Sequence, residues 1–211
     1  MEHAVAAKRT MKRLIKSALN VIARPLLRIR AQRMAAIIGR HLQPGDRVLD
    51  VGCGDLSIGN EIVRRSNVSW VGVDTIDYHG SDLEFHVYDG KTLPFKSGEF
   101  PVVILAFVLH HCADVDAVVR EAARTSNRKI IVLEDIVDGG FLSITMTRCH
   151  DYLVNRFISA RIPLPYQFKT SEKWTEIFRA HGFRKIAGEK MRTHPLAFVN
   201  QMIFILEREN G

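Results

Sequence analysis

The chain has 211 residues, of which 46% are hydrophobic and 25% are charged, and this composition is typical of a folded globular domain rather than of a disordered or fibrous chain. Its three cysteines form no CxxC pair and its apolar runs fall short of the roughly 18 residues that cross a bilayer, so we expect a reduced, cytoplasmic setting and no membrane span. The net charge of +7 is concentrated at the start: residues 1–40 hold ten Lys or Arg and one Glu, a local charge of +9 that leaves −2 for the other 171 residues.

This charge distribution predicts two parts, a basic helical leader or cap over residues 1–43 and the main domain over residues 44–211. Apolar residues recur in the leader at the spacing of an amphipathic helix, as Ile15, Leu19, Ile22 and Leu26. Pro25 ends or kinks this helix and suits the first turn of a second helix that runs towards His41.

A basic amphipathic leader has several interpretations, and the sequence leaves them open. It can lie on an anionic membrane surface, which would make a peripheral membrane contact through residues 1–40. It can neutralise nucleic-acid phosphates or serve as an organellar transit peptide. In the remaining interpretation the leader binds no partner: its two helices cover one face of the domain and expose a basic side to solvent.

A strand, a glycine turn and a helix follow the leader. The apolar run from Val48 to Val51 predicts a buried strand that ends at Gly52 and Gly54, and a helix follows over residues 57–65. A second strand over residues 70–74 ends at Asp74, 20 residues after Gly54, where a carboxylate can accept hydrogen bonds from ribose hydroxyls. Ser57 stands where the dinucleotide pattern GxGxxG has its third glycine, which argues against NAD.

These residues, together with Asp50 two positions before the first glycine, resemble the class I S-adenosylmethionine-dependent methyltransferases, in the type-11 group that acts on small molecules. The resemblance covers roughly residues 45–135. It rests on four motifs in the family's order, at residues 48–54, 71–74, 88–95 and 100–111, and the conjunction is far more specific than any one motif.

The family resemblance implies S-adenosylmethionine as the cofactor and an α/β fold. This fold is a doubly wound, Rossmann-like sheet of seven strands, mostly parallel, with an antiparallel C-terminal hairpin and with helices before it. Leu56 departs from the pattern, because the family usually has a third glycine at this position. A cofactor-dead interaction module with the methyltransferase fold is therefore kept as an alternative.

The resemblance also implies a role for each matching residue. The glycines let the backbone close on the amino-acid part of the cofactor, and Asp50 holds this loop and the ammonium group. Residues at the ends of the next strands contact the ribose, the adenine and the sulfonium end of the cofactor. Ile76 forms a further wall of the adenine pocket. The implied cofactor-binding residues are Asp50, Gly52, Gly54, Asp74, Thr75, Asp89, Gly90 and Ala106.

His110 and His111 are the predicted catalytic residues. They follow the fourth strand at the carboxyl edge of the sheet, where ligands of such folds bind, and a histidine titrates near neutral pH as a general base should. Asp114 is predicted to cap the next helix instead. No metal site is predicted, because His110 to Cys112 and the Cys149-His150 pair have no recognised ligand spacing.

The rest of the chain completes the predicted sheet, and the family resemblance implies that part of it covers the site. A fifth strand spans residues 129–134, and residues 141–158 form a segment whose Met, Phe and Tyr favour an apolar acceptor or additional core. A helix opens at Ser171 and closes at Gly182, and two strands over residues 183–189 and 198–206 form the hairpin.

The sequence therefore predicts a cytoplasmic methyltransferase that acts on a small, apolar or lipid-like acceptor. RNA methylation steered by the basic leader is a second interpretation, which lacks an interleaved pattern of basic and aromatic residues. Nucleic acid is accordingly the less favoured partner.

Overall fold

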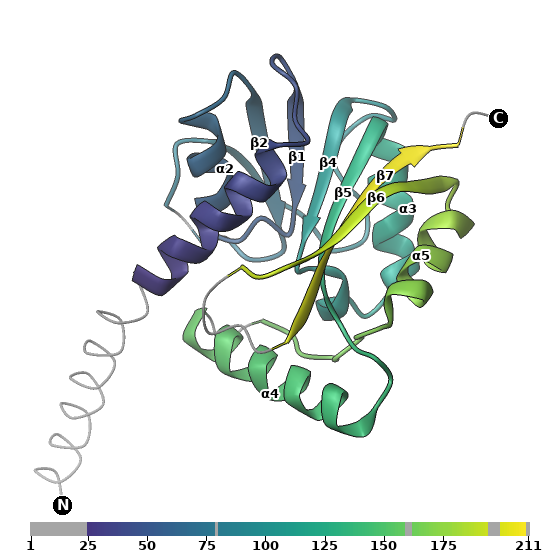
Figure 1. Ribbon diagram of the computed structural model, residues 1–211. Helices are drawn as coiled ribbons and strands as arrows, with labels where there is room; N and C mark the ends of the chain where they lie inside the picture. The colour runs from purple at the N-terminus through teal and green to yellow at the C-terminus, as the bar shows by residue number, and fades with distance from the viewer. Residues whose placement is uncertain (1–24, 79, 159–161, 194–198, 210–211) are drawn as a thin grey trace, which may run out of the picture.

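Seven strands form one sheet in the order β3-β2-β1-β4-β5-β7-β6 in the computed structural model of the chain (Figure 1). The structure describes residues 25–78, 80–158, 162–193 and 199–209. The first five strands pair in parallel, and β7 pairs antiparallel with both β5 and β6. The doubly wound sheet with its antiparallel hairpin is confirmed.

The central strands read as apolar runs because helices cover both of their faces. In β1 (Arg47–Val51) and β4 (Phe100–Ala106) nearly every side chain is buried. The other strands are β2 (Ser69–Asp74), β3 (Glu84–Val87), β5 (Ser126–Ile136), β6 (Phe183–Met191) and β7 (Asn200–Arg208). The carboxyl ends of the parallel strands meet at one edge, which brings the predicted cofactor and catalytic residues together.

Two apolar cores lie on the two faces of the sheet. One joins the sheet to α3 (Val115–Thr125) and α5 (Ser171–Ala180), with Trp174 and Phe178 fully buried. The other joins it to α2 (Ser57–Val63) and to the helix over residues 25–39. Asp114 caps α3 as predicted, since its side chain accepts a hydrogen bond from the Ala117 amide. The cap of α5 is Thr170 rather than Ser171, because the Thr170 hydroxyl accepts from the Lys173 amide.

The second predicted helix of the leader packs onto the domain. Residues 25–39 are helical, and Met34, Ala35 and Ile38 enter the core beside α2. The first predicted helix, with Ile15, Leu19 and Ile22, lies outside the described residues, so the membrane, nucleic-acid and targeting interpretations stay predictions. Within the described ranges, no helix combines the length and the apolar character needed to cross a membrane.

The segment after β5 forms α4 (Phe141–Ile158), which lies across the carboxyl edge of the sheet (Figure 1). The chain then returns through residues 162–170, where the Gln167 amide donates to the His110 carbonyl and Lys169 bridges to Ile136 of β5. A 3₁₀ turn, η1 (Leu109–His111), follows β4 at the same edge. The two histidines of η1 therefore lie beneath α4 and its return loop.

Candidate active site

The glycine loop after β1 folds tightly against the neighbouring strands. Gly52 has φ of 71°, and a Cβ atom there would lie 2.5 Å from a methyl group of Val108. Gly54 has φ of 57°, and no atom lies within 4 Å of the place where its Cβ would be. Gly52 is thus required by packing, whereas Gly54 leaves open space beside the backbone for a ligand.

Leu56, which replaces the family's third glycine, turns its side chain into the core. Its φ of 59° is the left-handed conformation that a glycine adopts without strain. The side chain is 3% exposed and packs against Gly72, where an added Cβ would come within 2.4 Å of it. The departure from the family pattern therefore costs backbone strain but does not fill the cofactor side of the loop.

Asp50 carries a buried carboxylate whose two oxygens have no hydrogen-bond partner among the described residues. Burial raises the pKa of this carboxyl to about 7, although the nearby indole of Trp70 favours the charged form. An unpartnered buried carboxylate destabilises the fold, and such a group points to a missing cation or donor. The ammonium group of S-adenosylmethionine fits this requirement, which is the role that the sequence implied for Asp50.

Asp74 and Asp89 both bind backbone amides of their own loops. The Asp74 carboxylate accepts hydrogen bonds from Gly54 at 2.9 Å and from Ile76 at 3.0 Å, so it ties the end of β2 to the glycine loop. Burial raises the pKa of Asp74, and these amide bonds oppose the rise. Asp89 is solvent-exposed and closes a turn by accepting from the amides of Lys91 and Thr92.

Thr75 and Gly90 lie beside each other across the ends of β2 and β3, since a Cβ on Gly90 would be 3.2 Å from the Thr75 methyl group. A cavity of about 80 Å³ opens next to Gly54 and is lined partly by Leu56 and Tyr78. Typical ligand pockets exceed about 300 Å³. This cavity is therefore large enough for only part of a nucleoside, and the rest of the nucleoside would lie outside it. A larger hollow, of about 640 Å³, lies around Arg128 and Glu207, on the opposite edge of the sheet from the predicted site.

The end of β4 presents Ala106, which is half-buried, and then Phe107, whose φ is 59°. A phenylalanine in this left-handed conformation is strained, and such strain is concentrated at functional sites. The guanidinium of Arg30, from the helix over residues 25–39, lies 4.9 Å from the centre of the Phe107 ring. Burial lowers the pKa of Arg30, while Asp135, Asp151 and Asp55 attract its charge. A residue of the leader thus reaches the site.

Glu134 of β5 holds the 3₁₀ turn η1 with both of its oxygens. One oxygen accepts from the Leu109 amide at 2.8 Å, and the other binds Nδ1 of His110. The ring of Phe168, from the return loop, stacks on His110 with centres 4.9 Å apart. His110 is 1% exposed and Glu134 is fully buried, so the turn is fixed from below by a carboxylate and from the side by an aromatic ring.

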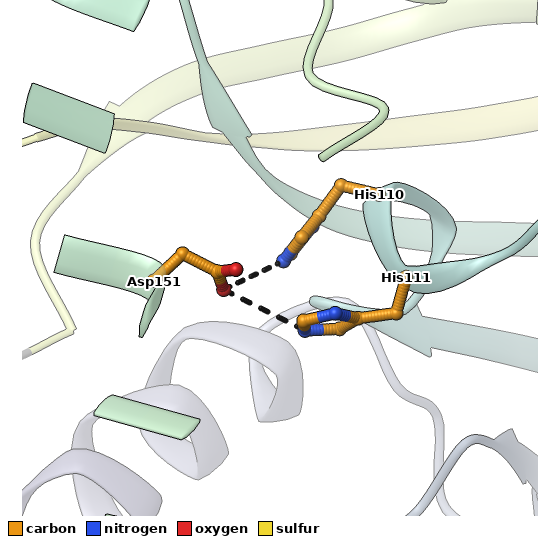
Figure 2. A group of neighbouring side chains, drawn as sticks. All are labelled: His110, His111 and Asp151. Atoms are coloured by element: carbon orange, nitrogen blue, oxygen red, sulfur yellow. Dashed lines mark hydrogen bonds and ion pairs between the residues drawn. The ribbon is translucent and has the colours of Figure 1, made fainter. Parts of the chain in front are cut away.

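Asp151 of α4 brings the two predicted catalytic histidines to one point. Its Oδ1 atom lies 3.3 Å from Nε2 of His110 and 3.6 Å from Nε2 of His111 (Figure 2). Nδ1 of His111 lies 2.8 Å from the Pro163 carbonyl, and Asn155 also binds the Asp151 carboxylate. The site therefore joins η1, α4 and the return loop.

The pKa values of the two histidine rings shift in opposite directions. Burial alone would lower the pKa of His110, but Glu134 and Asp151 raise it to about 10. Burial and the charge on His110 lower the pKa of His111 to about 4. Burial also raises the pKa of the neighbouring Asp135 to about 6. Near pH 7 His110 already carries the proton that a general base would need to accept, whereas His111 is neutral.

The helix α4 turns its polar side inward. Among its described side chains, the buried ones are Thr147, His150, Asp151 and Asn155, whereas Phe141, Leu142, Met146, Tyr152 and Leu153 are exposed. The expectation that Met146 and Tyr152 add to the core is wrong, because both are exposed. The surface that α4 presents to the histidines is instead suited to hydrogen bonds and charge.

Sequence reasoning missed four residues of this site, namely Arg30, Glu134, Asp151 and Asn155. The signal for the last two was present, since positions 147, 151 and 155 recur every four residues and place Thr, Asp and Asn on one side of a helix. Nothing in the sequence distinguishes this polar side from an ordinary solvated one. Arg30 was counted only as part of a basic leader.

Comparison with known proteins identifies a methyltransferase domain. A family model described as a methyltransferase domain, of type 11, matches residues 49–129. The 27-O-demethylrifamycin SV methyltransferase of Amycolatopsis mediterranei is 32% identical over 100 residues. The match covers 39% of this chain and 35% of that protein, so the chain spans about a third of the length of this curated relative.

Solved structures share the fold at low sequence identity. The Burkholderia thailandensis 1,6-didemethyltoxoflavin-N1-methyltransferase, solved with 1,6-didemethyltoxoflavin and S-adenosylhomocysteine, has a TM-score of 0.68 and 14% identity over 99% of this chain and 90% of its own. The [4+2]-cyclase SpnF has a TM-score of 0.65 and 16% identity over 85% and 81%. The sheet order and the matched family model support a class I S-adenosylmethionine-dependent methyltransferase domain, with residues 49–129 carrying the match.

Proposed function

We propose that this protein binds S-adenosylmethionine and methylates a small molecule. The observation that carries the proposal is the Asp50 carboxylate, which is buried and unpartnered in β1, four residues before the open backbone of Gly54. A cationic ligand with an amino-acid end fits that position. When bound, S-adenosylmethionine supplies a methyl group that is already activated on a sulfonium.

The residues of the chain would bind and orient rather than perform difficult chemistry. Asp50 would hold the ammonium group, Asp74 has lone pairs left for ribose hydroxyls, and Thr75 with Gly90 would border the adenine. Holding an acceptor atom in line with an activated carbon can contribute up to roughly 7–11 kcal/mol to the barrier reduction. Aligning two ligands at the carboxyl edge of the sheet is therefore the main task of this site.

We propose further that the acceptor has a polar reacting group on an apolar or lipid-like body. The polar inner side of α4 and the two histidines favour a hydroxyl or amine as the methylated group. Phe168 and Tyr166, whose rings lie 6.1 Å apart beside His110, offer an apolar wall for the remainder of the molecule. His110 and His111 stay the candidate catalytic residues, since they follow β4 at the carboxyl edge of the sheet.

Thermal melting of the full chain with S-adenosylmethionine and with S-adenosylhomocysteine tests cofactor binding. A ligand at 100 times its dissociation constant stabilises the fold by about 2.7 kcal/mol, so the melting midpoint should rise by several degrees. The Asp50→Ala variant should lose this rise, whereas Asp82→Ala, an exposed carboxylate outside the loop, should keep it. No shift of the wild-type protein at millimolar cofactor would favour the cofactor-dead module.

Methyl transfer is tested with radiolabelled S-adenosylmethionine and two acceptor pools. Label is expected in a small-molecule extract of hydroxylated aromatic and lipid compounds. Label in total RNA instead would support the RNA methyltransferase interpretation. Cofactor binding without label in either pool would contradict the proposed acceptor class.

A further inference from the structure

His110, His111 and Asp151 offer three ligand atoms that all lie within 4.8 Å of one another. Figure 2 shows both rings directed at the carboxylate of Asp151. Cofactor binding, as proposed above, uses none of these three side chains. The cluster is thus a separate feature of the acceptor half of the site.

The second nitrogen of each ring is anchored. Nδ1 of His110 binds the Glu134 carboxylate, and Nδ1 of His111 lies at hydrogen-bond distance, 2.8 Å, from the Pro163 carbonyl. Metal-binding histidines almost always donate their other N–H group to a carboxylate, a backbone carbonyl or water, because this fixes the ring and leaves the remaining nitrogen for the ion. Both rings are held in the orientation that metal binding requires.

The third ligand carries an unsatisfied oxygen. Asp151 is only 4% exposed. Its Oδ2 atom is buried and has no hydrogen-bond partner within the described ranges of the chain. The buried Glu134 carboxylate adds a further negative group to the cluster through its contact with Nδ1 of His110. A cation bound between the histidines and Asp151 would satisfy the oxygen and offset this charge.

We propose that His110, His111 and Asp151 bind a divalent transition-metal ion of the Zn²⁺ or Co²⁺ type, and that the polar group of the acceptor takes an open position on this ion. Two imidazoles with one carboxylate favour such ions over Mg²⁺ and Ca²⁺, which prefer oxygen ligands. Three protein ligands leave a position open, as in catalytic zinc sites.

Coordination to a divalent ion lowers the pKa of a bound hydroxyl group, so the ion would prepare the acceptor for methylation. The two histidines then act as metal ligands rather than as proton acceptors. This role in the reaction rests on the proposed function, whereas binding of the ion does not.

Cobalt titration of the full chain tests the site. The protein is first freed of metal with a chelator, and Co²⁺ is then added while the visible absorption bands of protein-bound cobalt are recorded. We expect about one bound equivalent, which Zn²⁺ displaces and Mg²⁺ does not. Elemental analysis after dialysis against Zn²⁺ gives the same stoichiometry independently.

Variants assign the signal to the cluster. His111→Gln and Asp151→Asn should each abolish the bands, and Glu134→Gln should weaken binding by roughly 10- to 100-fold through the loss of its anchor to His110. His181→Gln is the matched control, because His181 pairs with Asp116 outside the site. Circular dichroism and the melting shift with S-adenosylmethionine show that each variant is folded.

The outcomes separate the two proposals. Absence of cobalt bands, or bands that persist in both His111→Gln and Asp151→Asn, would overturn the metal site, while a melting shift with S-adenosylmethionine in the same samples would leave the proposed function standing. Cobalt binding that depends on the cluster, without any response to the cofactor, would support the ion site and contradict the methyltransferase activity.

Discussion

Replacing Asp50 with asparagine should stabilise the cofactor-free protein at neutral pH while removing cofactor binding. The carboxylate is fully buried, and burial raises its pKa from 3.8 to about 7. Between these values the folded protein holds a proton that the unfolded chain has lost, so stability falls as the pH rises. Asparagine has nearly the same shape and does not titrate.

The magnitude follows from the pKa of Asp50. One pKa unit corresponds to about 1.4 kcal/mol, and the range from pH 5 to pH 7 covers two units. The free energy of unfolding of Asp50→Asn, relative to wild type, should therefore rise by about 3 kcal/mol between pH 5 and pH 8 and be level above pH 7. Taking the difference between two proteins cancels the other titrating groups that they share.

Urea unfolding at pH 5, 6, 7 and 8 measures this difference. Asp46→Asn is the contrasting variant, because the Asp46 carboxylate is buried with partners: it accepts from the Gln43 amide and pairs with Arg128. That substitution should destabilise the protein. A difference between Asp50→Asn and wild type that does not change with pH, or an Asp50→Asn variant less stable than wild type at pH 8, would refute the reasoning from an unpartnered carboxylate.

Three further substitutions test single features of the fold and the site. Arg30→Gln should lower the free energy of unfolding by about 1–3 kcal/mol, because it removes the cation over Phe107 near the buried carboxylates; Arg33→Gln, on the exposed side of the same helix, should change it by no more than about 0.5 kcal/mol. Gly52→Ala should cost about 1–3 kcal/mol by overpacking against Val108, and in denaturant titrations a second change, Val108→Ala, should recover part of this loss, whereas additive effects would contradict the contact. Asp114→Ala should cost about 0.5–2 kcal/mol through loss of the α3 cap, and an unchanged melting midpoint would argue against that cap.

The sequence predicted the parts of the fold whose signals are local. Strands β1 and β4 are continuous apolar runs, and Asp114 precedes an apolar helix face, so neither needed knowledge of distant contacts. The order of the family motifs then fixed which strand ends meet at one edge. Asp50 could be identified for the same reason, because it belongs to the local motif at the end of β1.

The side chains that contact the two histidines could not be predicted, because they come from distant segments of the chain. From the sequence, Glu134 is predicted only as the end of a strand. The pairing of β5 with β4 places it where it accepts a hydrogen bond from the Leu109 amide. Asp151 lies 41 residues from His110 in the chain. The apolar residues of α4 suggested that this helix would bury them, whereas the helix buries its polar side.

The polar underside of α4 separates the evolution of specificity from the maintenance of the fold. Both hydrophobic cores form around the sheet and the other helices, without any side chain of α4 that the structure describes. If α4 contacts the acceptor as proposed, substitutions on this polar side would change acceptor recognition while leaving the buried apolar contacts intact. On that proposal, acceptor preference can change in this helix at little risk to the apolar packing.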